Sequence, residues 1–163
     1  MSAATIGMDL DKPRQVTGMY KHILIATDGS ELGQKAVGQG MALARALDAK
    51  VLVVTVTEPW SSMVSGEMTI AFPADEYAAG AAAAASRILA GSLDIARKAG
   101  VSIDTLHVKD RFPAEGIVET AAARGCDLIV MASHGRRGLS RMLLGSQANR
   151  VVTHSTIPVL ICR

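Results

Sequence analysis

Apolar residues gather in five short runs along the chain, and four of these runs are nearly continuous rather than alternating. Short runs rich in Val, Ile and Leu are typical of strands that are buried on both faces of a parallel sheet. The third run alternates more with polar residues, which favours a position at the edge of the sheet. The predicted strands span residues 22–27, 51–56, 103–108, 128–131 and 158–162.

Segments with helical spacing lie between the predicted strands, because their apolar residues recur every three or four positions. The second helix is rich in alanine, and its expected buried stripe includes Leu93. The expected buried side of the fourth helix includes Val152. The predicted helices span Ser30–Leu47, Asp75–Ala99, Pro113–Arg124 and Ser146–His154.

The alternation of strands and helices predicts one fold class. Short connections between the elements indicate an α/β domain with an open five-stranded parallel sheet, order 3-2-1-4-5, helices on both faces and right-handed crossovers. This arrangement is Rossmann-like. We expect a flexible N-terminal leader over residues 1–18, a single domain over residues 19–163, and a mobile flap over residues 60–74.

Composition and charge exclude several classes of protein. Hydrophobic residues make up 49% of the 163 residues and aromatic residues only 3%, which predicts a packed, aliphatic core. A net charge of +2 is too small to indicate a nucleic-acid or membrane surface. With no signal-peptide pattern and no apolar run near the ~20 residues of a membrane span, we expect a cytoplasmic protein. Cys126 and Cys162 lack metal-ligand spacing and are expected to be reduced, buried thiols.

Two polar segments that contain glycine follow the first and fourth predicted strands. The first is Ala26-Thr27-Asp28-Gly29-Ser30, and the second begins with Met131-Ala132-Ser133-His134-Gly135. In open α/β sheets, ligands bind past the carboxyl ends of the strands, where the strand order reverses. We therefore expect the two segments to meet at a ligand crevice, although the second segment is also compatible with a plain connector.

The second segment continues with features of an anion site. Gly135 and Gly138 permit positive φ and leave backbone N–H groups uncovered. Ser146 is expected to be the N-cap of the fourth helix, whose first-turn N–H groups at residues 146–148 favour an anion. Neither the GxxxxGK[ST] motif nor a GxGxxG motif after the first strand is present. The pattern therefore predicts a phosphate cradle of another type.

Three segments carry a resemblance to a known family. They are MYKHILIATDGS at 19–30, MASHGRRGLSRMLLGSQANRVV at 131–152 and STIPVLIC at 155–162. With these segments the chain resembles the universal stress protein family over Met19–Arg163. Nucleotide-binding members carry Gly, two residues, Gly, nine residues and then Gly-Ser/Thr. Here Gly135 and Gly145-Ser146 match that pattern, and Ala132 stands at the first glycine.

The resemblance implies an adenine nucleotide alpha hydrolase-like fold and an ATP-binding regulator of a stress response. Its output would be conformation or dimer state, with no catalytic residues and at most slow ATP hydrolysis. Mg²⁺ or Mn²⁺ would lie between phosphate oxygens rather than on protein ligands. The resemblance also implies a homodimer through the last strand, Pro158–Cys162, and an unidentified protein partner.

The same resemblance implies where the nucleotide binds. Ala26, Thr27 and Asp28 would face the ribose or adenine, and Val56 would line the adenine pocket. Residues 132–135 would run along the ribose and first phosphates, and residues 145–148 would hold the β and γ phosphates. The implied ATP-binding residues are Ala26, Thr27, Asp28, Val56, Ala132, Ser133, His134, Gly135, Gly145, Ser146, Gln147 and Ala148.

Alternatives stay open for some residues and for the function. Asp28 is either a ligand contact or a turn former that caps the first helix. Arg136, Arg137 and Arg141 either screen a triphosphate or form a solvated loop face. The substitution at Ala132 also allows an interaction module of the same fold that binds no nucleotide. A nucleotidyl- or phosphotransferase is disfavoured because no nucleophile–base–orienter set is apparent.

Overall fold

The computed structural model describes residues 18–62, 73–135 and 144–163. Five parallel strands form one sheet in the order β3-β2-β1-β4-β5, so the predicted fold class is confirmed, and with it the edge position of the third strand. Each strand agrees with its predicted bounds to within one residue at either end. The strands are β1 (His22–Ala26), β2 (Lys50–Val56), β3 (Asp104–Val108), β4 (Leu128–Ala132) and β5 (Val159–Cys162).

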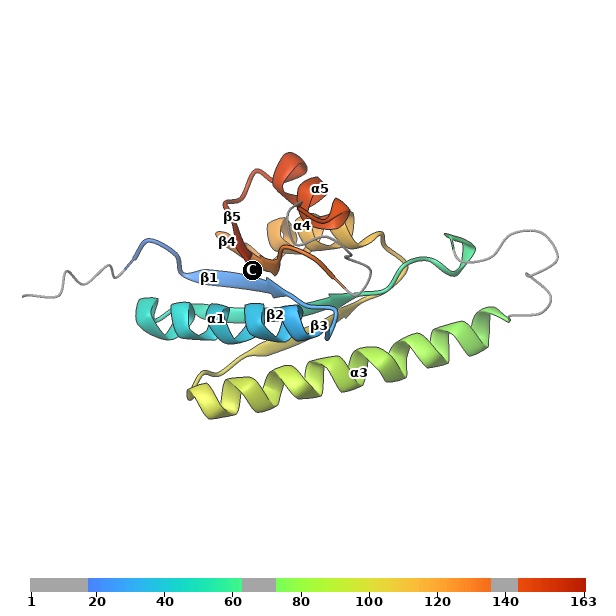
Figure 1. The fold of residues 1–163 in the computed structure, drawn as a ribbon, viewed down its shortest axis with the longest axis horizontal. Coiled ribbons are helices and arrows are strands. Elements are labelled where there is room, and N and C mark those ends of the chain that lie inside the picture. The colour runs from blue at the N-terminus through green and yellow to red at the C-terminus, as the bar shows by residue number, and fades with distance from the viewer. Residues whose placement is uncertain (1–17, 63–72, 136–143) are drawn as a thin grey trace, which may run out of the picture.

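Helices cover both faces of the sheet (Figure 1). One layer consists of α1 (Glu31–Leu47) and α3 (Ala74–Ala99), and the other of α4 (Pro113–Ala123) and α5 (Ser146–His154). A short 3₁₀ helix, η1 (Trp60–Ser62), follows β2. The predicted leader, apart from Gly18, and most of the predicted flap lie outside the described residues.

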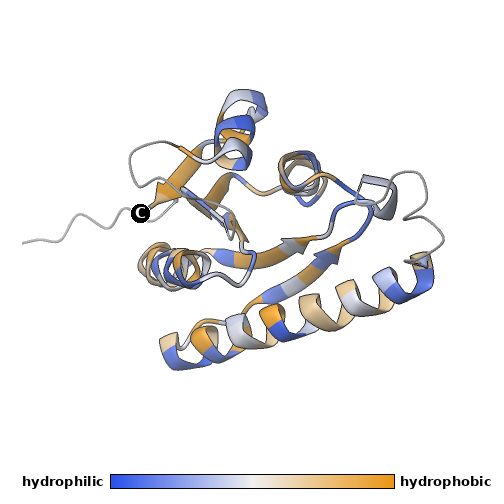
Figure 2. Ribbon diagram, turned by 45° about the vertical axis from the view of Figure 1, so that its right-hand side comes forward, coloured by the Kyte–Doolittle hydropathy of each residue, from blue (hydrophilic) through white to orange (hydrophobic). Residues whose placement is uncertain are grey.

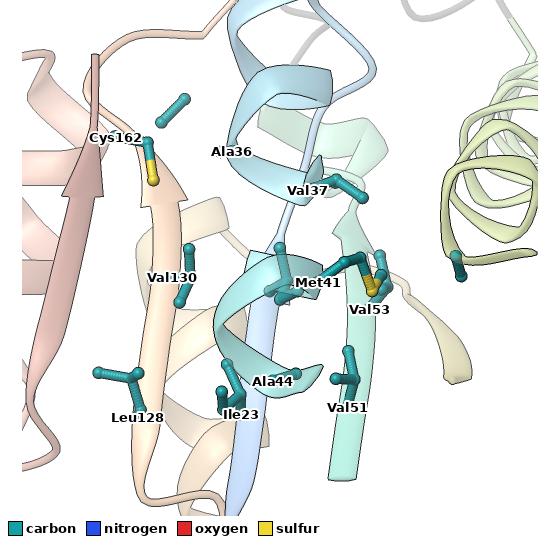
Figure 3. Close-up of a cluster of buried hydrophobic side chains, with 13 residues drawn as sticks. Ile23, Ala36, Val37, Met41, Ala44, Val51, Val53, Leu128, Val130 and Cys162 are labelled. Carbon is teal, nitrogen blue, oxygen red and sulfur yellow. The ribbon is translucent and has the colours of Figure 1, made fainter. Parts of the chain in front are cut away.

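The central strands carry two aliphatic cores, one on each face. On the α1 face, Val37 and Met41 of the helix pack over Ile23, Val53 and Val130 of the strands (Figure 3), and all five side chains are fully buried. Figure 2 shows the corresponding pattern, with hydrophobic residues concentrated in the strands and mixed polarity along the helices. A strand that is buried on both faces has apolar side chains on both, so its apolar and polar residues do not alternate. The continuous apolar runs of the sequence are accordingly the central strands.

Two predictions about buried helix faces are wrong. Leu93 of α3 is 42% exposed, whereas the neighbouring Ser92 is buried and donates its hydroxyl to the Ile88 carbonyl at 3.2 Å. Val152 of α5 is 45% exposed, whereas Val151, which the same spacing also predicts to face inward, is fully buried. In α3, the small residue Ser92 faces the sheet in place of Leu93.

Candidate functional site

A cavity of about 420 Å³ opens past the carboxyl ends of β1, β2 and β4. The strand ends form its floor, α3 contributes to its lining, and residues from the first turns of α4 and α5 also line it. Its volume lies within the range of roughly 300–1,000 Å³ that is typical of small-molecule sites. All the residues predicted to form the site line this one cavity: Ala26, Thr27, Asp28, Val56, Ala132, Ser133, His134, Gly135, Gly145, Ser146, Gln147 and Ala148.

The segments that follow β1 and β4 meet at this cavity, as predicted. The two strands are neighbours, with Ala26 paired to Met131. Beyond them, Gly135 lies so close to Asp28 that a Cβ on the glycine would stand 2.8 Å from Oδ2 of the carboxylate. Gly135 does not use the positive φ that glycine permits, and lack of space explains the glycine instead. Gly138 lies outside the described residues.

The start of α5 differs from the prediction by one residue. Gly145 is the N-cap, not Ser146, because the Gly145 carbonyl accepts the first helical hydrogen bond from Asn149 N at 2.9 Å. Gly145 N donates to the Ser133 carbonyl at 2.8 Å, and a Cβ on Gly145 would lie 2.9 Å from that oxygen. The N–H groups of residues 146–148 precede the first helical donor, so the helix itself supplies no acceptor for them.

Asp28 forms the turn at the end of β1 and also lines the cavity. Its Oδ1 accepts from Ser30 N at 3.0 Å, which confirms the turn at the end of β1. The cap of α1 is Ser30, whose Oγ accepts from Gly33 N at 3.1 Å, so the prediction that Asp28 caps this helix is wrong. Because the Asp28 side chain also lines the cavity, forming the turn does not prevent it from contacting a ligand.

Gln147 ties α5 to α4. Its Oε1 accepts from Ala114 N at 3.1 Å, in the first turn of α4, where the N-cap Phe112 provides no side-chain hydrogen bond. This bond commits the side-chain oxygen of Gln147 to the neighbouring helix. What the first turn of α5 offers to the cavity is therefore chiefly its backbone N–H groups and the Ser146 hydroxyl.

Ala132 occupies an ordinary strand position. It is the last residue of β4, pairs with Cys162 of β5 and has no positive φ. Alanine therefore fits the backbone where the family pattern has glycine. The next two residues contact each other through their side chains, since Ser133 Oγ lies 3.0 Å from Nδ1 of His134.

Several lining residues were missed by the sequence reasoning. Thr57 and Glu58 follow β2 and reach the cavity, and the rule that identified the ends of β1 and β4 could have found them. Thr57 Oγ1 lies 2.6 Å from Nε2 of His107, and the Tyr77 hydroxyl donates to the Glu58 carbonyl at 2.7 Å. No sequence signal places Ile88 in the lining, because this depends on where the long helix α3 crosses the sheet.

Two ionisable side chains that contact Thr57 and Glu58 have shifted pKa values. Burial, reinforced by the positive charge of Lys109, lowers the pKa of His107. Burial, with smaller effects of Glu58 and Asp110, raises the pKa of Tyr77. At neutral pH the imidazole is therefore neutral and the phenol keeps its proton.

The charges on the lining limit what could neutralise an anionic ligand. Among the described lining residues, the acidic side chains are Asp28 and Glu58, and there is no lysine or arginine. Within the described ranges, no group of three or more His, Cys, Asp or Glu residues could hold a metal ion. The helices of the same ranges include none with the length and apolarity required to cross a membrane. Arg136, Arg137 and Arg141 lie outside the described residues.

Comparisons with known proteins agree with this architecture. Residues 19–163 match the family described as "Universal stress protein family". Universal stress protein MJ0531 of Methanocaldococcus jannaschii is 32% identical over 155 residues, which cover 92% of this chain and 86% of that protein. The family match includes every residue that lines the cavity.

Solved structures show the same fold. The structure of hypothetical protein MJ0577 is 28% identical with a TM-score of 0.75, covering 88% of this chain and 96% of that chain. A universal stress protein in complex with cAMP is 26% identical with a TM-score of 0.64, covering 88% of this chain and 97% of that chain. The five-stranded α/β sheet and the cavity at its carboxyl edge thus belong to a fold with solved examples.

Proposed function

The chain belongs to the universal stress protein family, and from that premise we propose that it binds an adenine nucleotide, ATP, in the cavity past β1 and β4. The observation that carries the proposal is the convergence of all the predicted site residues on one cavity, at the point where the strand order reverses. A universal stress protein of the same fold in complex with cAMP supports the choice of an adenine nucleotide.

The cavity offers different chemistry at its two ends, which sets the direction of the bound nucleotide. The phosphates lie against the first turn of α5, where the N–H groups of residues 146–148 and the helix dipole favour negative charge. Asp28 and Thr27 meet the ribose at the end of β1, and Val56 contacts the adenine at the end of β2. Gly135 and Gly145 keep the space between these segments narrow.

A divalent ion, Mg²⁺ or Mn²⁺, accompanies the phosphates in this proposal. The described lining contributes two carboxylates and no lysine or arginine, so a triphosphate needs neutralisation from elsewhere. When bound, the ion would neutralise part of the phosphate charge, and Asp28 is the carboxylate of the lining at the end of β1 that could hold it directly or through water. Removing the ion with a chelator is expected to weaken ATP binding at least about tenfold, measured by the same titration as below.

The output of binding is a change of conformation or dimer state rather than efficient catalysis. The pair Ser133–His134 lies in the cavity, but a fast reaction would also need a group that orients the imidazole. Because the described lining shows no such group bonded to His134, we propose that any ATP hydrolysis is slow. The dimer forms through the edge strand β5, where Leu160 is 41% exposed, and it signals to a partner protein in a stress response.

Isothermal titration of the nucleotide-stripped protein with MgATP tests the proposal. Saturable binding with one site per chain supports it, and absence of binding at millimolar nucleotide contradicts it. That second result would favour an interaction module of the same fold that binds no nucleotide. The observation that suggested such a module was Ala132, and the ordinary strand geometry of that residue weakens the suggestion.

A further inference from the structure

The end of the cavity formed by β2 is separated by one strand from the end formed by β4. In the sheet order, β1 separates β2 from β4, and adjacent strands lie about 4.8 Å apart. A nucleotide with its phosphates at the first turn of α5 therefore directs its base toward the residues that follow β2. Thr57 and Glu58 are the polar residues of the lining there.

Thr57 is held in one position at this end. Its backbone N–H donates to the Val108 carbonyl at 2.9 Å, and its own carbonyl accepts from Arg111 N at 3.2 Å. The adjacent Glu58 is also held through its carbonyl, which accepts from the Tyr77 hydroxyl at 2.7 Å. These bonds fix the backbone of Thr57 where the residue lines the cavity.

The partner of the Thr57 hydroxyl decides whether it donates or accepts. Thr57 Oγ1 lies 2.6 Å from Nε2 of His107, which is not part of the cavity lining. Nε2 of His107 accepts from the hydroxyl in one neutral tautomer and donates to it in the other. A neutral imidazole can accept at Nε2, and burial together with Lys109 lowers the pKa of His107, which favours the neutral form. In the neutral tautomer with the proton on Nδ1, the Thr57 proton points to His107, and the oxygen lone pairs are left for other donors.

We propose that Thr57, oriented by His107, selects nucleotides whose base carries an exocyclic amino group at the end of the cavity formed by β2. An oxygen that has already donated its proton can accept from an amine, as on adenine. It is repelled by a carbonyl oxygen at the same place, as on hypoxanthine or guanine. Thr57 is thus a specificity-determining residue and His107 a positioning residue. The inference rests on the proposed binding of an adenine nucleotide in this cavity.

Titrations with three nucleotides test this selection. The probes are MgATP, the magnesium complex of purine riboside triphosphate, which lacks only the amino group, and MgITP, which carries a carbonyl oxygen instead. Wild-type protein is expected to bind ATP about fivefold more tightly than purine riboside triphosphate and about tenfold more tightly than ITP. Thr57→Val should bring all three affinities within about twofold of one another, and Thr57→Ser should restore the preference.

Two further variants separate selection from structural damage. Thr105→Val removes a hydroxyl from an exposed position on β3, outside the cavity, and should leave the preference unchanged. His107→Ala should reduce the preference for ATP while leaving the affinity for purine riboside triphosphate within about twofold, which a general loss of structure would not do. Nitrogen NMR of His107 in the wild type should show Nε2 without a proton.

The outcomes distinguish this inference from the function on which it rests. If the wild type binds no ATP, the proposed function fails. If it binds ATP but shows no preference over the two analogues, only the inference is overturned. The same holds if Thr57→Val keeps the preference while Glu58→Gln loses it, because the selecting oxygen would then belong to Glu58.

Discussion

Two glycines of the cavity, Gly135 and Gly145, each lie against an oxygen atom that leaves no room for a side chain. Gly145 bonds to the Ser133 carbonyl at 2.8 Å, and Gly135 packs against the Asp28 carboxylate. At both positions a methyl group would occupy space that a neighbouring oxygen already fills. The family pattern of glycines therefore has a steric reason in this chain, and at Ala132 the chain departs from the pattern in an ordinary strand position without positive φ.

Enlarging Gly145 should disrupt binding without unfolding the domain. In Gly145→Val the new Cβ lies about 2.9 Å from the Ser133 oxygen, so the first turn of α5 must move away from the cavity. We expect MgATP affinity to fall at least about tenfold in a calorimetric titration, with an unchanged circular dichroism spectrum. Gly38→Ala is the matched control, since a Cβ there has no neighbour within 4 Å. Unaltered affinity in Gly145→Val would contradict the role of this segment.

The thiol of Cys126 gives a prediction for alkaline pH. Burial, with a smaller effect of Asp127, raises the pKa of Cys126 from 9.0 to about 11. As the pH rises, the thiol of the unfolded chain loses its proton first, and this ionisation favours unfolding. The contribution of Cys126 is therefore intact below pH 9.0 and is lost as the pH rises toward about 11.

Urea unfolding at several pH values measures this effect. Between pH 9.0 and about 11, the free energy of unfolding should fall more steeply for the wild type than for Cys126→Ala. Cys162 and Tyr77 also have raised pKa values, but they are present in both proteins, so the difference isolates Cys126. Parallel pH profiles would show that this thiol is not desolvated.

At the scale of elements, strands were easier to predict than helix faces. The central strands are buried on both sides, so their apolar runs carry a strong signal, and β4 came within one residue of its prediction. Helix α3 is rich in alanine, and alanine is compatible with either side of a helix. Its orientation is set by packing against the sheet, which places Ser92 inside and Leu93 outside and cannot be read from spacing alone.

Some parts of the site could be predicted from the sequence, whereas others depend on how the helices and strands pack. The ends of β1 and β4 carry Asp28 and the glycine segment, and the switch-point rule brings them together. Ile88 reaches the cavity only because α3 crosses there. The hydrogen bond between Thr57 and His107 joins residues that are 50 positions apart and depends on the pairing of β2 with β3. The sequence therefore predicted the parts of the site that follow β1 and β4. The positions of Ile88 and Thr57 depend on tertiary packing and could not be predicted in this way.

Truncating side chains on α1 and α3 tests which faces of these helices are buried. Met41 of α1 is fully buried, so Met41→Ala is expected to lower the free energy of unfolding by about 2–5 kcal/mol. Leu93→Ala on α3 should cost less than about 1 kcal/mol, because the side chain is 42% exposed. Chemical denaturation of the two variants provides the comparison. Equal losses would mean that Leu93 is buried, as its apolar spacing suggests.

At the scale of the whole molecule, the described sheet has the cavity at its carboxyl edge and the strands β3 and β5 at its two sides. The strand order places β3 and β5 at the sides, while the carboxyl ends of β1, β2 and β4 surround the cavity. Within the proposed function, β5 is also the dimer contact, and its neighbour β4 leads directly into the cavity. Nucleotide binding and dimer formation would thus involve adjacent strands of the same sheet.

A charge at the β5 edge should weaken the proposed dimer. Leu160 is 41% exposed in the single chain, and Leu160→Lys would place a charge in a contact between two copies. We expect the wild type to have the mass of a dimer in light scattering and the variant to shift toward monomer. Val152→Lys on α5, which is exposed to a similar extent but does not belong to the edge strand, serves as the control. A monomeric wild type would contradict the dimer directly.

The central claim is that an adenine nucleotide binds in the cavity past β1 and β4, and amide NMR spectra recorded during titration with MgATP test it most directly. The account predicts saturable shifts at the amides of Gly145, Ser146 and Gln147, at Asp28 and at Thr57, with little change at the distant start of β1. Shifts confined to residues outside the cavity, or none at millimolar MgATP, would contradict it.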